Sequence, residues 1–118
     1  MKTRPSTASL ALLALAALSF VGCGTTTTVR LSGPPGTQVS GHYRTTQGSM
    51  DFNGNADWQM DFVHQRLEEF EFQKSSVEPP VALEILRGRR VLVRATAPTG
   101  TSGLRVRHED GWQVENVR

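Results

Sequence analysis

Cysteine is almost absent from the sequence: Cys23 is the single one among 118 residues. An internal disulfide within these residues is therefore excluded, and a folded domain has to rely on its hydrophobic core. An odd cysteine in an exported protein indicates an intermolecular bond, a free thiol or a covalent modification. The choice among these depends on the position of Cys23, directly after an apolar segment.

The motifs of common catalytic and nucleotide-binding sites are also missing. The sequence has no Gly-x-Ser-x-Gly elbow, no phosphate-binding loop and no His-Glu-x-x-His segment. The three histidines, His42, His64 and His108, are far apart and lack the spacing of metal ligands. We therefore predict that the protein is not an enzyme and that it has no cofactor and no bound metal.

Two groups of carboxylates are weaker candidates for a site. Asp51, Asp57 and Asp61 lie in and after the segment DFNGNAD, but they lack the dense oxygen-ligand loop of a calcium site. We interpret this segment as a hairpin loop, because Asn-Gly tolerates positive φ. Glu69 and Glu71 lie two residues apart, on the same face of a predicted strand. This spacing could serve a glycosidase, but it is more typical of a solvated surface.

A long apolar run of membrane-spanning length is missing as well. The run at residues 8–21 is shorter than the roughly 20 residues that a span needs, and Lys2 and Arg4 precede it. A positive start, an apolar run and small residues in that order indicate a secretory signal peptide over residues 1–22. The alternative, a buried helix, needs a larger body to cover it.

Excess charge of one sign is absent once the signal peptide is removed. The full chain has 13 basic and 11 acidic residues, and Lys2 and Arg4 leave with the signal, so 11 of each remain. We therefore predict no nucleic-acid partner.

Charge is distributed unevenly along the chain after the signal peptide. Acidic residues gather in residues 51–80 and arginines in residues 81–118. This pattern indicates either opposite charges paired across adjacent strands or a dipolar surface that orients a partner. The segment RGRRVLVR indicates solvated turn charges or a contact with phosphate groups.

The segment Phe20-Val21-Gly22-Cys23 resembles the end of a bacterial lipoprotein signal, with Phe20 where that family usually has Leu. The resemblance implies diacylglycerol on the Cys23 sulfur, cleavage between Gly22 and Cys23, and acylation of the new amino terminus. Several acyl chains hold a protein stably at a membrane, whereas one does not. In Gram-negative lipoproteins, Asp directly after the lipidated cysteine implies retention at the inner membrane. This sequence has Gly24 at that position, so the resemblance implies the outer membrane if the organism is Gram-negative. The alternative is a secreted protein with a free thiol.

The pattern after Cys23 predicts short antiparallel strands. Apolar and polar residues alternate through segments such as WQMDFV and FEFQ, with glycine or proline between most segments. We predict an all-β protein, a small antiparallel sandwich of seven or eight strands after an N-terminal signal helix. The predicted divisions are 1–22, signal peptide; 23–28, lipidated cysteine and polar tether; and 29–118, sandwich domain. A helical turn at 64–68 stays open.

The predicted core takes one residue from every second position of these segments. Its members are Leu31, Val39, Tyr43, Phe52, Trp58, Met60, Phe62, Phe70, Phe72, Leu83, Ile85, Val91, Val93, Leu104, Val106, Trp112 and Val114.

The segments VRLSGPPGTQVSGHY and VALEILRGRRVLVRATA resemble small immunoglobulin-like sandwich domains of exported bacterial proteins, including the mycobacterial transport-accessory membrane proteins. This resemblance supports the fold more than any activity. Together the patterns predict a lipid-anchored cell-envelope protein with a non-catalytic binding or accessory domain. Its partners would be the membrane, through acyl chains on Cys23, and a protein of the envelope, with no small-molecule ligand. A secreted binding domain and a small envelope enzyme are the alternatives.

Overall fold

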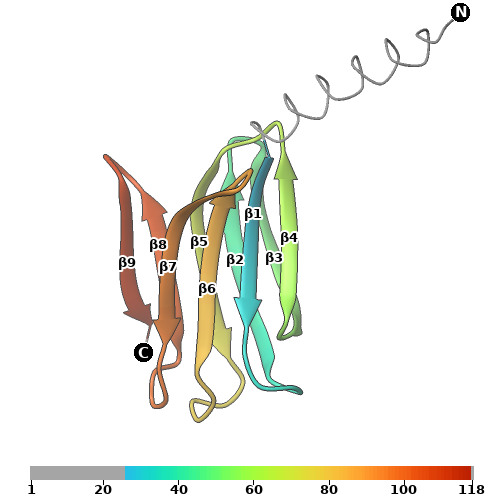
Figure 1. The fold of residues 1–118 in the computed structure, drawn as a ribbon, viewed down its shortest axis with the longest axis vertical. Coiled ribbons are helices and arrows are strands. Elements are labelled where there is room, and N and C mark those ends of the chain that lie inside the picture. Colours follow the sequence, from blue (N-terminus) through green and yellow to red (C-terminus); the bar gives the residue numbers. More distant parts are fainter. Residues whose placement is uncertain (1–25, 118) are drawn as a thin grey trace, which may run out of the picture.

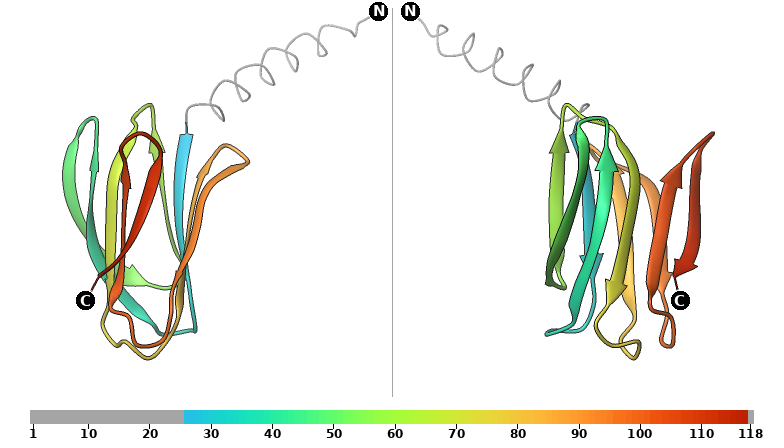
Figure 2. Two further views of the ribbon diagram at one scale, coloured as in Figure 1. Left: turned by 90° about the vertical axis from the view of Figure 1, so that its left-hand side faces the viewer. Right: turned by 180° about the vertical axis from the view of Figure 1, so that it is seen from behind.

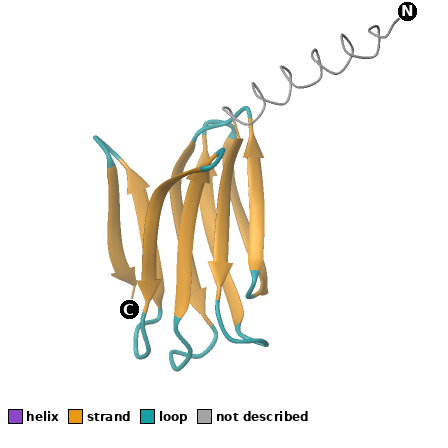
Figure 3. Ribbon diagram, viewed as in Figure 1, coloured by secondary structure: helices purple, strands orange, loops and turns teal. Residues whose placement is uncertain are grey.

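The computed structural model describes residues 26–117, and this part of the chain is built of strands joined by turns and loops (Figures 1 and 3). Alternating apolar and polar residues, many of them β-branched or aromatic, favour strands over helices here. The strands are β1 (Thr26–Ser32), β2 (Gln38–Thr45), β3 (Gly48–Asn55), β4 (Trp58–Val63), β5 (Leu67–Lys74), β6 (Val81–Arg87), β7 (Arg90–Ala97), β8 (Gly103–His108) and β9 (Trp112–Val117).

The strands form two antiparallel sheets that pack face to face. One sheet has four strands in the order β4-β1-β6-β7, and the other has five in the order β3-β2-β5-β8-β9. The edge-on view in Figure 2 shows the two layers. The predicted all-β antiparallel sandwich is confirmed, with nine strands in residues 26–117 where seven or eight were expected.

Two kinds of connection build this arrangement. Tight turns join β2 to β3, β6 to β7 and β8 to β9 as hairpins within one sheet. The other five connections cross from one sheet to the other, so β1 pairs with β4 and β6, and β5 pairs with β2 and β8. β1 and β5 thus each pair with strands from distant parts of the chain.

The core lies between the sheets and is built from the inward-facing positions. Eleven of the predicted core residues are buried, and Phe52, Trp58, Met60 and Trp112 pack against them while partly exposed. Phe52 stacks on Trp58 with ring centroids 4.4 Å apart, and on Phe70 at 5.3 Å. Five further residues of the buried set were not predicted: Val29, Leu67, Val81, Leu86 and Ala97.

The predicted hairpin loop at DFNGNAD is wrong. Asn53–Asn55 belongs to β3 and pairs with β2, and the chain then crosses to the other sheet before β4. Gly54 serves packing there, because a Cβ at this position would lie 2.8 Å from Cδ1 of Trp58. The glycine leaves space for the tryptophan ring rather than supplying a turn.

Two predicted core residues are exposed, Val91 at 41% and Val114 at 44%. On β7 the cause is a β-bulge: Ile85 pairs with Val93 and Leu86 with Val91, which leaves Leu92 as an extra residue. Beyond a bulge the inward and outward positions exchange. Val114 lies on β9, which has β8 as its one strand neighbour at the edge of the larger sheet.

Two predicted boundaries also differ from the structure. β1 begins at Thr26, so most of the threonine segment assigned to a tether is strand, with partners on both β4 and β6. Two neighbouring ladders and β-branched side chains favour this extension. The helical turn at 64–68 is absent, because β5 begins at Leu67 and residues 64–66 form the crossing between the sheets.

Candidate functional site

The predicted lipidation site lies outside the described residues. Gly22 and Cys23 fall in residues 1–25, so their processing stays a prediction. Covalent geometry still limits how far Cys23 is from the domain. Three residues of chain span at most roughly 11 Å, so the start of β1 at Thr26 lies within that distance of Cys23.

Several turns surround the start of β1 and define what we call the anchor-proximal end of the sandwich (Figure 1). The amide of Gly88 donates to the carbonyl of Thr26 at 3.2 Å, and Val63 pairs with Thr26 across the β1–β4 ladder. The amide of Thr46 donates to the carbonyl of Arg66 at 3.0 Å. The β2–β3, β4–β5, β6–β7 and β8–β9 connections all lie at this end (Figure 1).

The opposite, distal end contains a buried lysine. Lys74 is 7% exposed, and its Nζ donates to backbone carbonyls of two loops. The acceptors, which we call the Lys74 cage, are Pro79 at 2.8 Å, Pro98 at 3.0 Å, Val77 at 3.2 Å and Ala97 at 3.4 Å. Burial lowers the pKa of the Lys74 ammonium from its ordinary value. Lys74 thus fastens the β5–β6 loop to the β7–β8 loop.

The histidines and aspartates singled out in the sequence are not brought together. His42 is on β2, His64 is in the β4–β5 crossing, and His108 ends β8. Asp51 lies on β3 of one sheet, whereas Asp61 lies on β4 of the other and accepts a hydrogen bond from Thr28 Oγ1 at 2.8 Å. Neither set forms a shared site.

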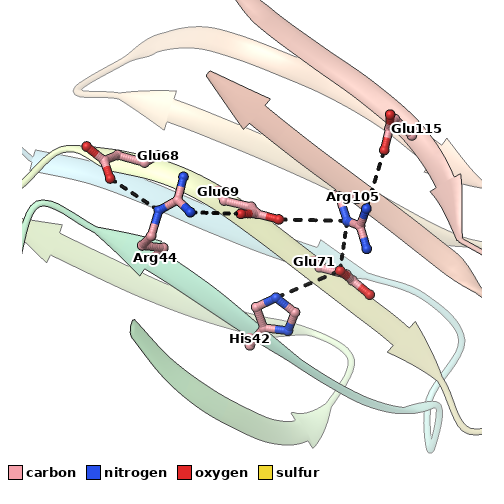
Figure 4. A network of polar contacts seen from close by, with 7 residues as sticks. All are labelled: His42, Arg44, Glu68, Glu69, Glu71, Arg105 and Glu115. Atoms are coloured by element: carbon pink, nitrogen blue, oxygen red, sulfur yellow. Dashed lines mark hydrogen bonds and ion pairs between the residues drawn. The ribbon is translucent and has the colours of Figure 1, made fainter. Parts of the chain in front are cut away.

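The glutamates of β5 belong to a charge network on the outer face of the five-stranded sheet (Figure 4). Arg105 on β8 donates from Nε to Glu71 Oε1 at 2.9 Å and lies 3.7 Å from Glu69 Oε2. Arg44 on β2 approaches Glu69 from the other side, with Nη1 3.4 Å from Oε1. His42 Nε2 lies 3.8 Å from Glu71 Oε1, and Arg105 also reaches Glu115 on β9.

Three members of this network have the chemistry of metal ligands. His42, Glu69 and Glu71 each place one potential ligand atom within 4.8 Å of the others. The guanidinium of Arg105 already lies against both carboxylates and supplies the positive charge that a cation would bring. The hydrogen bond to Glu71, followed by its charge, raises the pKa of Arg105 above the ordinary value. In the structure these three side chains belong to an ion-pair network in which Arg105 contacts both carboxylates.

The prediction that adjacent strands pair opposite charges is confirmed. Glutamates of β5 face arginines of β2 and β8, and Glu84 on β6 pairs with Arg94 at 2.8 Å and with Arg30 at 3.6 Å. Glu71 is nevertheless 6% exposed, which a solvated face does not predict. Its neighbours on both sides, Arg105 and His42, cover it.

Sequence reasoning missed two features, the Lys74 cage and the burial of Glu71. Lys74 is the one lysine among residues 26–117, and it ends a strand beside two proline-containing loops. A solitary lysine at such a position could have been flagged, but its carbonyl acceptors depend on loops that meet only in the folded chain. The partners of Glu71 likewise depend on strand register.

The described part of the chain contains no helix with the length and apolar character that a membrane crossing requires. Comparison with known proteins found no match: no protein family fits the sequence, and no curated protein and no solved structure matches the chain.

Proposed function

We propose that this protein is a lipid-anchored component of a bacterial cell envelope, and that its sandwich is a binding or accessory domain without catalytic activity. The supporting observation is the position of Cys23, three residues before β1 and directly after a signal-like segment. Gly24 and Thr25 are the two residues between Cys23 and the start of β1. Acyl chains on that cysteine would therefore hold the anchor-proximal end of the sandwich at the membrane surface.

The charged groups of the sandwich support a non-catalytic role. Catalytic carboxylates work in sites where their protonation is tuned and a substrate can approach. Glu69 and Glu71 instead lie on an outer sheet face and are held by Arg44 and Arg105. Such a face suits contact with another protein, as do the edge strands, to which a partner can add a strand.

Intact-mass analysis of the full chain, expressed in a bacterium with a lipoprotein pathway, tests the anchor. We expect the membrane fraction to contain a chain that begins at Cys23 and carries three acyl chains. Cys23→Ser is the matched variant, and it should yield no acylated species, because a hydroxyl does not replace the thiolate as acceptor. Phe20→Leu should be processed at least as completely as the natural sequence.

A soluble, cleaved chain with a free Cys23 thiol would refute the anchor and favour the secreted alternative. The sandwich would be unaffected by that result, because its core between the two sheets is built from residues 29–106.

A further inference from the structure

The arginines of residues 26–117 fall into two groups. Five of them, on the sheet faces, pair with carboxylates: Arg30, Arg44, Arg94, Arg105 and Arg107. The other four have no ion pair within the described residues, and all are exposed: Arg66, Arg87, Arg89 and Arg90. These four, which we call the free arginines, lie in or beside the β4–β5 and β6–β7 connections at the anchor-proximal end.

The distal end has a different charge. Its four connecting segments, 33–37, 56–57, 75–80 and 98–102, contain Asp57 and Glu78 as their exposed charged residues. The buried Lys74 ammonium is enclosed by carbonyl groups. Unpaired positive charge in residues 26–117 is therefore concentrated at the end nearest Cys23.

Two of the free arginines line a groove between the sheets at that end. Arg66 and Arg87 share this groove of about 130 Å³ with His108, Trp112 and the apolar Leu67 and Leu92. The rings of His108 and Trp112 pack together, with centroids 4.6 Å apart. Arginine binds phosphate oxygens with its planar set of donors, and tryptophan favours the interface between water and lipid.

The carboxylates of the connections at this end, Glu109 and Asp110, lie at the tip of the hairpin whose His108 and Trp112 line the groove. Glu109 and Asp110 are in the β8–β9 turn, and this hairpin splays away from β7 in Figures 1 and 2. They therefore do not occupy the β6–β7 turn, where Arg87, Arg89 and Arg90 lie.

We propose that the anchor-proximal end docks on an anionic lipid surface, with phosphate headgroups contacted by the free arginines and received in the Arg66–Arg87 groove. This inference rests on the proposed lipid anchor, which brings Thr26, at that end, within roughly 11 Å of the acylated residue. This limit is close to the screening length of roughly 8–10 Å in physiological salt, so the attraction between arginines and anionic headgroups becomes strong when this end contacts the surface. Docking would fix the orientation of the sandwich instead of leaving it free on its lipid.

Hydrogen exchange of the acylated protein in vesicles tests the docking. The protein is reconstituted in phosphatidylcholine alone and in phosphatidylcholine mixed with phosphatidylglycerol. Amides of residues 63–67 and 86–92 should exchange roughly tenfold more slowly in the anionic vesicles, since each arginine near such a surface adds binding free energy. Residues 75–80 and 98–102, at the distal end, are the internal control and should not change.

Two double variants with equal loss of charge separate a specific end from general attraction. Arg66→Gln with Arg87→Gln should abolish the slowing, whereas Arg30→Gln with Arg94→Gln, on the outer face of the four-stranded sheet, should retain it. Thermal unfolding checks that both remain folded. Equal exchange in the two vesicle types, or equal losses in the two variants, would overturn the proposal.

The intact mass, measured before reconstitution, shows whether Cys23 is acylated. A failure of the proposed anchor is therefore distinguished from a failure of the docking. If the purified chain carries no lipid, it is mixed with the same vesicles and sedimented. Binding to the anionic vesicles alone, lost in the Arg66→Gln and Arg87→Gln variant, would still support the docking surface; absence of binding to both would refute it.

Discussion

Lys74 is a single residue whose removal tests how the distal end is held. Lys74→Met keeps most of the apolar stem but removes the Nζ donor from the carbonyls of Val77, Pro79, Ala97 and Pro98. The Val77 and Pro98 carbonyls still accept from backbone amides at 2.8 and 3.0 Å, so the loss falls mainly on Pro79 and Ala97. We expect the unfolding free energy to fall by about 1–2 kcal/mol, because a charged donor and its hydrogen bonds are lost, one of them in a buried position. Urea denaturation measures this, with the exposed Arg94→Met as control, expected to change stability by less than about 0.5 kcal/mol. Equal losses would contradict the cage.

The same lysine predicts a pH dependence. Its pKa is lowered in the folded protein from the ordinary value of 10.5, because burial disfavours the charged form. Between the lowered value and 10.5 the unfolded chain binds more protons, so the unfolding free energy rises with pH in that window. Wild-type protein should therefore gain stability relative to Lys74→Met as pH is raised through it. Urea denaturation at a series of pH values measures the difference, and a constant difference would refute the prediction.

At the scale of elements, the central strand β5 is approached closely from both sides through glycine. A Cβ on Gly41 of β2 would lie 1.9 Å from the carbonyl oxygen of Glu71, and one on Gly103 of β8 would lie 1.9 Å from that of Phe72. Both positions lack a side chain because the neighbouring backbone occupies its space.

Gly41→Ala should therefore destabilise the sandwich by roughly 2–3 kcal/mol, since the backbone of β5 would have to move. The neighbouring exposed Ser40→Ala is the control and should have little effect. Thermal or urea unfolding measures both. A Gly41→Ala protein as stable as the natural one would show that β2 and β5 can separate without loss of stability.

The elements also show what sequence patterns predict and where they fail. Alternation predicted the strands around Phe62, Phe70 and Leu83, because one face of each is buried. It failed at Asn53–Asn55, where Gly54 makes room for a tryptophan ring, and at Val91, where a bulge shifts the alternation. Both failures come from contacts with another strand, which local sequence does not contain.

At the scale of the whole molecule, composition and turn spacing predicted two antiparallel sheets, but not which strands pair. The charge network needs β5 between β2 and β8, so that Glu71 meets both His42 and Arg105. The concentration of the free arginines at one end likewise depends on which turns share that end. Long-range topology therefore supplied the candidate surfaces, whereas the predicted anchor came from local sequence.

The place of β1 has a mechanical consequence. This strand is the first one after Cys23, and it is held by six register pairs with β4 on one side and six with β6 on the other. Tension from a membrane-held Cys23 would pull β1 along its own axis and load both ladders in shear, many hydrogen bonds at once. A chain attached through an edge hairpin would instead open one bond after another. An anchor at Cys23 would thus transmit its load to a strand that is paired on both sides.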